Sequence, residues 1–151
     1  MARIVVSDRV YTTTESLQFI DITDDVDKFV RKQNVYDGLV TICSQHTTMA
    51  VVINEGEELL LKDIRDHLYE FAPLGKLYRH DDLAKRKCPS DEPKNAHAHL
   101  QALMLGGNQS APVRNGKLHL GQWQRIMLIE LDGPRKRTVT MTLVASQKGT
   151  E

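Results

Sequence analysis

The stretch APVRNGKLHLGQWQRIMLIELDGPRKRTVTMTLVAS, residues 111–146, decides the fold class. Near its start, Ala111–Arg114 and Lys117–Leu120 flank the pair Asn115-Gly116. An Asn-Gly pair between two strand-like segments is a strong signal for a two-residue turn, because both residues readily adopt a positive φ. This part of the chain therefore predicts a β hairpin.

The same stretch predicts a second strand pair further on. Trp123–Leu131 and Thr138–Ser146 are rich in apolar and β-branched residues, which favour strands. The residues between them, Asp132–Arg137, include a Gly-Pro pair that is typical of a turn. The last third of the chain is therefore predicted to be β.

The first third of the chain has strand patterns as well. Arg3–Thr14 alternates in character, and Ser16–Thr23 places apolar residues on one side. After a break at Asp37-Gly38, Leu39–Ser44 and Thr47–Ile53 are short apolar segments, as in buried strands. We therefore expect seven or eight strands, clustered at the two ends of the chain.

Three segments predict helices. The first begins at Thr23, a capping hydroxyl followed by two acids that favour the positive end of the helix dipole. The second covers about Glu55–Phe71, with apolar residues on one stripe and charged residues elsewhere. The third is Asn95–Leu105, with Asn95 as a cap and Gly106-Gly107 as a stop.

Strands at the two ends of the chain favour an α+β fold over a doubly wound one. No repeat or linker divides the chain, so we expect one compact domain over residues 1–151, with a mixed or largely antiparallel sheet. Ala72–Pro93 is polar and shows no clear period. A loop of this length inside a compact domain is usually functional or poorly ordered.

Composition excludes several classes of protein. Lys and Arg number 20 and Asp and Glu number 20, whereas a general nucleic-acid binder carries a basic surplus. No apolar run approaches the roughly 20 residues of a membrane span, and the N-terminus is too charged for a signal peptide. Two cysteines, Cys43 and Cys88, favour free thiols in a cytoplasmic protein over a single bridge. We expect neither nucleic acid nor membrane as a partner.

The histidines carry the candidate chemistry. His46 follows an apolar strand, His80 stands in the polar loop, and His99 lies near the buried face of the third helix. His97 is two residues from His99, about 200° away around a helix, so both cannot face one site. Two further histidines are expected to be structural or exposed: His67 and His119.

Three imidazoles from separate elements can hold a catalytic zinc with one open position. The chain has no HExxH or CxxC motif, so spacing alone leaves both a metal site and a chance arrangement open. Asp81 can orient the His80 imidazole. Glu55 is either a carboxylate beside His46 or a helix N-terminal acid. The three cations of residues 135–137 either grip a phosphate or form a solvated turn.

Several short motifs, taken together, resemble the YjbQ-like family. They follow one another from about residue 5 to residue 145, and as a series they are very specific. At residue 122 the chain has Gln where the family usually has Thr. The motifs are Gln45-His46-Thr47-Thr48, Ile53-Asn54-Glu55, Tyr78-x-His80-Asp81, Asn95-x-x-Ala98-His99-Leu100, Pro112-Val113-x-x-Gly116, Leu120-Gly121-x-Trp123-Gln124 and Glu130-x-Asp132-Gly133-Pro134-Arg135.

The resemblance implies a trimer-forming α+β domain, a homotrimer or hexamer, with a polar cleft near a subunit boundary. It implies a site shared by His46, His80 and His99, which act as acid and base or hold a divalent metal, Zn²⁺ or Mg²⁺. Glu55 and Asp81 are the implied orienting carboxylates of this catalytic site. Substrate or anion contacts are expected from four residues: Ser110, Gln124, Arg135 and Arg137.

Members of this family are sometimes labelled secondary thiamine-phosphate synthases, which join a pyrimidine pyrophosphate to a thiazole phosphate. The resemblance therefore implies a small-molecule enzyme acting on a phosphorylated substrate, with thiamine phosphate synthesis as its most specific form. Two alternatives stay open: a zinc-dependent hydrolase, and a non-enzymatic trimer that binds phosphorylated metabolites.

Overall fold

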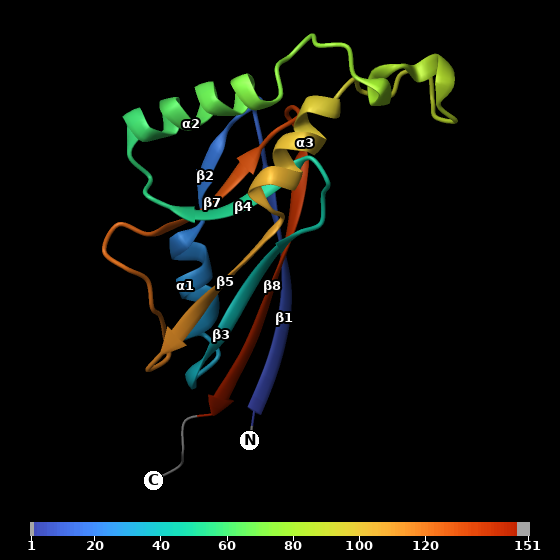
Figure 1. Cartoon of the computed structure of the whole chain (residues 1–151). Helices are drawn as coiled ribbons and strands as arrows, with labels where there is room; N and C mark the ends of the chain where they lie inside the picture. The colour runs from blue at the N-terminus through green and yellow to red at the C-terminus, as the bar shows by residue number, and fades with distance from the viewer. Residues whose placement is uncertain (1, 148–151) are drawn as a thin grey trace.

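Strand β8 (Lys136–Gln147) lies inside the larger of two sheets, between β1 (Ala2–Thr12) and β3 (Val35–Ser44). Next to β3 follow β5 (Asn108–Arg114) and β6 (Lys117–Leu118), giving the order β1-β8-β3-β5-β6. Every pair in this sheet is antiparallel. The two ends of the chain therefore meet in one sheet, as Figure 1 shows.

A smaller sheet has the order β2-β7-β4, also antiparallel. Its strands are β2 (Phe19–Asp21), β7 (Arg125–Glu130) and β4 (Met49–Asn54). Alternate residues of β4 and β7 enter two different apolar clusters, so this sheet is buried on both faces. One cluster fills the space towards the larger sheet, and the other lies towards the long helices.

The computed structural model describes residues 2–147, so Met1 and residues 148–151 of the predicted domain lie outside the described residues. Its α-helices are α1 (Thr23–Arg31), α2 (Glu58–Phe71) and α3 (Ala96–Leu105). Helix α1 packs with the core between the sheets, whereas α2 and α3 contribute to the second cluster. Within residues 2–147 no helix is long and apolar enough to cross a membrane.

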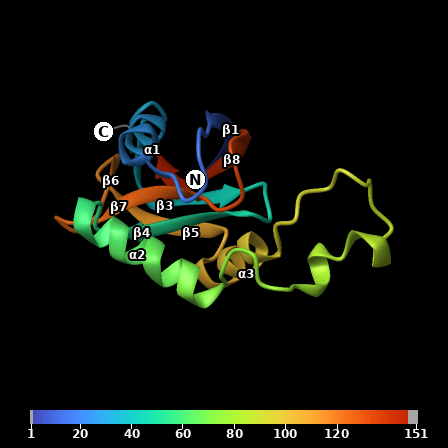
Figure 2. The same ribbon diagram turned by 90° about the horizontal axis from the view of Figure 1, so that it is seen from above.

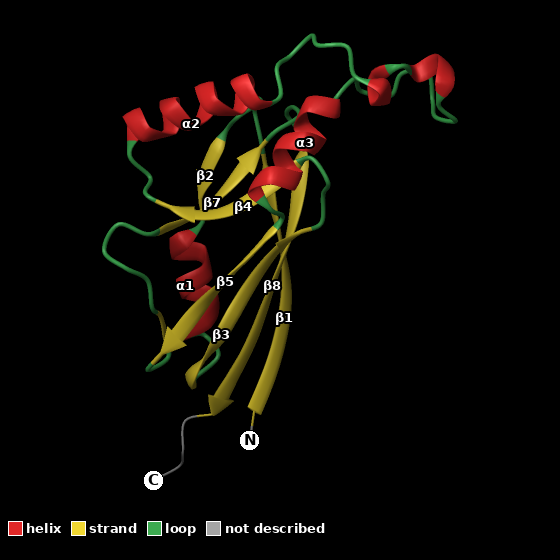
Figure 3. Cartoon of the chain, in the orientation of Figure 1, coloured by secondary structure: helices red, strands yellow, loops and turns green. Residues whose placement is uncertain are grey.

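The predicted fold class is confirmed: the chain is an α+β domain with three helices and antiparallel sheets (Figure 3). The predicted hairpin is present, with β5 and β6 joined at Asn115 and Gly116, whose φ angles are 52° and 73°. Positive φ at both central residues is what a type I′ turn requires. The second predicted strand is shorter than expected, because Leu17 adopts a φ of 52° and leaves the extended conformation.

Two other boundaries differ from the predicted ones. Helix α2 begins at Glu58, because the Glu57 carboxylate accepts the N–H groups of Leu59 and Leu60 at 2.9 and 2.8 Å and so caps the helix. Strand β8 begins at Lys136, within the predicted turn, because pairing with β1 extends to its first residue.

The predicted loop projects from the body of the molecule as an arm, which we define as residues 73–94 (Figures 1 and 2). It holds two short 3-10 turns, Arg79–Asp81 and Leu83–Lys85. Leu77, near the start of the arm, is 99% exposed. The arm leaves the C-terminal end of α2 and returns to the N-terminal end of α3, and it carries His80 with it.

Candidate active site

His99 links the other two candidate histidines. Its ring meets that of His80 edge to face, with the ring centroids 4.8 Å apart and an interplanar angle of 68°. His99 and His46 line one cavity of about 380 Å³. His99 and His80 line another of about 460 Å³, and both cavities share Leu100 as a wall. The three predicted histidines therefore lie along two adjoining cavities.

His46 is fixed by the start of β8. The N–H of Gln45 donates to the Thr138 carbonyl at 3.1 Å, and the N–H of Thr138 donates to Nε2 of His46 at 2.8 Å. The Ser44 hydroxyl oxygen accepts the backbone N–H of His46 at 3.1 Å. Because Nε2 is an acceptor, the neutral ring carries its proton on Nδ1. The strand thus sets both the position and the tautomer of this imidazole.

Electrostatics hold two of the imidazoles neutral. Burial lowers the pKa of His46 below its usual range, and the charge of Arg137 lowers it further against the opposing charge of Glu130. Burial likewise lowers the pKa of His99, followed by the effect of the neighbouring His80. An ordinary histidine has a pKa of about 6.5, so both rings are neutral at pH 7.

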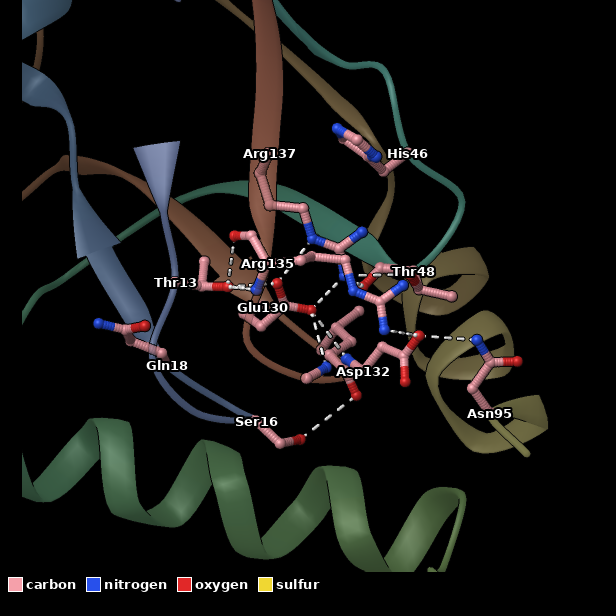
Figure 4. Close-up of polar contacts among 12 residues, drawn as sticks. Thr13, Ser16, Gln18, His46, Thr48, Asn95, Glu130, Asp132, Arg135 and Arg137 are labelled. Atoms are coloured by element: carbon pink, nitrogen blue, oxygen red, sulfur yellow. Dashed lines mark hydrogen bonds and ion pairs between the residues drawn. The ribbon is translucent and has the colours of Figure 1, made fainter. Parts of the chain in front are cut away.

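A buried ion pair lies beside His46. Glu130 and Arg137 are each 1% exposed, and Figure 4 shows the Arg137 guanidinium with Glu130 on one side and His46 on the other. Nε of Arg137 donates to Glu130 at 2.6 Å, while Nη2 donates to the second carboxylate oxygen and to Oγ1 of Thr48 at 3.1 Å. Thr13 Oγ1 donates to the same carboxylate at 2.8 Å.

The Glu130 carboxylate is stabilised in its charged form. Burial alone would raise its pKa, but the hydrogen bonds from Arg137, the Asp132 N–H and Thr13 outweigh burial and hold the pKa below its usual range. Arg137 was predicted to contact the substrate. Being buried and paired, it has no surface for a ligand in this structure, and its charge acts instead through His46.

Arg135 lies at the surface and is also paired. Its Nη2 lies 2.9 Å from a carboxylate oxygen of Asp132. The same oxygen accepts a hydrogen bond from Nδ2 of Asn95 at 2.7 Å (Figure 4). Asn95 immediately precedes α3, so the β7–β8 turn is tied to the start of the helix that carries His99.

Asp81 has a different contact from the expected one. Its Oδ1 accepts the N–H of Ala96, the first residue of α3, at 3.0 Å. Among residues 2–147 it makes no hydrogen bond to the His80 imidazole. Instead, Nη1 of Arg86 donates to the carbonyl oxygen of His80 at 2.9 Å. Asp81 therefore positions α3, and through it His99.

Like Asp81, Arg135 and Arg137, three further predicted site residues line neither histidine cavity. Glu55 follows β4, and its own N–H donates to Oδ1 of Asn54. Ser110 is on exposed β5 surface, paired with the hydroxyl of Thr41 at 2.9 Å. Gln124 accepts the N–H of Gly121 within the β6–β7 loop. This loop lies on the side of the molecule away from α3 (Figures 1 and 2). Within one chain the structure does not bring these three to the histidines.

The described residues do not fit a preformed metal site. Within residues 2–147, no three His, Cys, Asp or Glu side chains are placed so that they can hold a metal ion. A three-imidazole zinc site requires three nitrogen lone pairs directed at one point. Here Nε2 of His46 already accepts a backbone N–H, and the rings of His80 and His99 meet edge to face.

Comparison with known proteins finds one matching family and several similar sequences. The family model described as UPF0047 protein YjbQ-like matches residues 8–146. The chain belongs to the YjbQ-like family. A UPF0047 protein of Archaeoglobus fulgidus is 46% identical over 127 residues, which are 84% of this chain and 91% of the relative. YugU of Bacillus subtilis, another UPF0047 protein, is 34% identical, over 83% of this chain and 89% of its own. The predicted family is thus confirmed.

Solved structures of family members have the same fold. A YbjQ-like protein from Sulfolobus solfataricus P2 superposes with a TM-score of 0.87 at 36% identity, covering 97% of this chain and 100% of the other. A protein from Aeropyrum pernix K1 gives a TM-score of 0.82 at 34% identity, covering 95% and 99%. The two-sheet architecture is therefore shared across nearly the full length of these relatives.

Two residues near the histidines were not predicted from the sequence to belong to the site, namely Glu130 and His97. Glu130 ends an apolar strand, and nothing local shows that Arg137, seven residues later, will neutralise it. His97 was set aside, yet it is buried and lines a cavity of the arm. The helical angle between His97 and His99 was the available signal, and the two do line different cavities.

Proposed function

We propose that this chain is a cytoplasmic enzyme that acts on a small phosphorylated molecule, with His46 and His99 as its proton-handling groups. The observation that carries the proposal is the pair of neutral imidazoles lining one cavity. A catalytic base must be unprotonated at the operating pH, and the lowered pKa values of both imidazoles keep them so at pH 7. Perturbed histidines in a cavity are candidates for that role on physical grounds.

The two imidazoles have complementary capacities. His46 has its proton on Nδ1, so it can donate a hydrogen bond to an oxygen atom that gains negative charge in the reaction. The His99 imidazole makes no hydrogen bond among residues 2–147, so its nitrogen lone pair is available to accept a proton. His80, packed edge-on against His99, helps keep that ring neutral.

Thiamine phosphate synthesis is the most specific form of this proposal. In that reaction the bond between the pyrimidine methylene carbon and a pyrophosphate oxygen breaks, and its electron pair leaves with pyrophosphate. The thiazole nitrogen then forms the new C–N bond with its own lone pair. The main demand on the enzyme is to stabilise the departing anion, for which N–H donors and cations are suited. The neutral His46 and His99 imidazoles each carry one N–H group that can act as such a donor.

We also propose that copies of the chain associate as a homotrimer through the outer face of the five-stranded sheet. Ile4, Val144, Leu39 and Pro112 form one row across four neighbouring strands. Ile4, Val144 and Leu39 are 69%, 44% and 47% exposed. A contiguous apolar row on a sheet face is typical of a surface that another protein covers. In a homotrimer three copies present this row around a threefold axis, so that each row is covered by the other two copies.

An activity assay tests the enzyme proposal. The purified chain is incubated with the pyrimidine pyrophosphate and the thiazole phosphate in the presence of Mg²⁺, the usual counter-ion of pyrophosphate. We expect thiamine phosphate from the wild type and a loss of at least about 100-fold in His99→Gln. The matched control, His67→Gln on α2, keeps wild-type activity because His67 lines neither histidine cavity. Equal product from wild type and His99→Gln would rule out the proposed role.

A further inference from the structure

The arm encloses a cavity that the acid–base pair does not use. Its volume is about 960 Å³, and it lies between the first and last parts of the arm and the start of α3. Lys76, Arg79, Lys94 and His97 are among its walls. None of these residues was predicted to bind a substrate.

The charges of this arm cavity are not balanced. Its two acids are already engaged: Asp81 accepts the N–H of Ala96, and Asp82 pairs with Lys85 at 2.8 Å. Lys76, Arg79 and Lys94, by contrast, form no ion pair among residues 2–147. The three cations outnumber the two acids, one of which is paired with Lys85 outside the cavity, and a positive surplus on a concave surface attracts an anion.

His97 gives an independent indication of a ligand. It is only 8% exposed, and its imidazole makes no hydrogen bond to any of residues 2–147. Its ring nitrogens still keep some accessible surface, since Gln101 Oε1 is the one fully buried side-chain N or O atom without a partner among residues 2–147. Since His97 lines the arm cavity, a polar group bound there can supply the missing hydrogen bond.

The arm cavity adjoins the proposed active site. Leu77, Tyr78 and Arg79 line both the arm cavity and the cavity of His80 and His99. Arg79 therefore stands in the wall common to the two spaces. A small molecule with one end in the arm cavity can reach the histidines with the other.

We infer that the arm cavity binds the phosphate or pyrophosphate group of the substrate, through Arg79, Lys94 and His97. A guanidinium and an ammonium group donate charge-assisted hydrogen bonds to phosphate oxygens, and the imidazole adds another. The identity of the molecule that carries this group rests on the proposed function. The binding of an anion in the arm cavity does not. It moves the anion contact away from Arg135 and Arg137, which are paired with acids.

Titration calorimetry with inorganic pyrophosphate tests this inference on the full chain, at constant ionic strength. We expect one site per chain. The double variant Arg79→Gln with Lys94→Gln should weaken binding by about tenfold or more, as loss of charged hydrogen bonds does. Both residues are exposed, so their replacement leaves the fold intact. His97→Phe should weaken binding further, and His97→Gln less, because Gln retains a donor.

The matched control removes two charges outside the cavity, at exposed lysines that do not pair with its acids. Lys87→Gln with Lys117→Gln should change pyrophosphate binding by less than about twofold. Equal weakening in both double variants would show a general effect of charge and would overturn the inference. So would a wild-type chain that does not bind pyrophosphate.

The same titration separates this inference from the proposed enzyme function. His99→Gln should bind pyrophosphate like the wild type while losing turnover, since His99 does not line the arm cavity. Loss of pyrophosphate binding in Arg135→Gln, with binding retained in the Arg79 and Lys94 variant, would place the anion elsewhere and contradict the inference. A chain that binds pyrophosphate in the arm but shows no turnover would leave the inference standing and remove the enzyme proposal.

Discussion

The backbone N–H of Thr138 donates a 2.8 Å hydrogen bond to Nε2 of His46. Burial lowers the pKa of the same imidazole, and the charge of Arg137, the residue directly before Thr138, lowers it further. Two consecutive residues of β8 therefore act on this ring: Thr138 fixes its orientation and tautomer, and Arg137 adds to the effect of burial on its pKa. The acid–base capacity of His46 depends in this way on the strand ladder rather than on a neighbouring catalytic side chain.

The free energy of unfolding should fall as the pH is lowered from about 7 towards 5. The pKa values of His46 and His99 are lowered in the folded chain, so the unfolded chain, with histidine near 6.5, binds more protons in this range. Stability therefore rises with pH across this window. Denaturant titrations at a series of pH values measure the slope.

Variants of single histidines show which residues cause this dependence of the free energy of unfolding on pH. His46→Gln and His99→Gln should each make it shallower, and the Gln side chain can still accept the Thr138 N–H at position 46. His67→Gln should leave it unchanged, because His67 is exposed on α2. An identical slope in His46→Gln, His99→Gln and wild type would contradict the assignment.

Arg137→Met should destabilise the chain by about 3–5 kcal/mol, because it leaves the buried Glu130 carboxylate without its partner. Chemical denaturation measures the loss. Adding Glu130→Gln should recover much of it, since the isolated charge is then removed while the amide oxygen can still accept the Asp132 N–H. Arg135→Gln, at a surface pair, should cost less than about 1 kcal/mol. Equal losses in Arg135→Gln and Arg137→Met would disprove the role of burial.

Asp81→Ala should destabilise the chain by about 0.5–2 kcal/mol, because the N–H of Ala96 loses its acceptor at the start of α3. Thermal unfolding measures this change. Asp81→Asn should recover most of the loss, since the amide oxygen can accept the same N–H. If Asp81→Asn destabilised the chain as much as Asp81→Ala, the stabilisation would come from the carboxylate charge. That result would contradict the role of the hydrogen bond to the Ala96 N–H.

The oligomeric state should depend on the outer face of the five-stranded sheet. Leu39→Asp and Val144→Asp place a charge in the exposed apolar row and should convert a trimer to a monomer in light-scattering measurements. Leu59→Asp, at an exposed apolar position on α2, should leave the mass unchanged. A monomeric wild type, or a Leu39→Asp variant that stays trimeric, would contradict the proposed interface.

Much of the fold followed from local signals in the sequence. Asn115-Gly116 predicts its hairpin because the positive φ angles are a property of those two residues. The division into two sheets was not predictable in the same way. Strands β4 and β7 are buried on both faces, so the residues between their ends are apolar and do not show which sheet the strands join.

The site was predicted in part, and the limits have a physical cause. Element junctions singled out several histidines, and the family resemblance selected three of them as one site: His46, His80 and His99. The structure places these three along adjoining cavities. The fate of Arg137 could not be predicted, because its partner Glu130 lies on a strand of the other sheet. The burial of Arg137 results from how the two sheets pack, and the spacing of residues along the sequence does not predict that packing.

Long-range ¹H–¹⁵N NMR of the imidazoles tests the central claim most directly. At pH 7 we predict a neutral His46 with its proton on Nδ1 and a neutral His99. Both should shift when the phosphorylated thiamine precursors are added, whereas exposed His67 should not. A His46 that is protonated at pH 7, or neutral with its proton on Nε2, would contradict the claim.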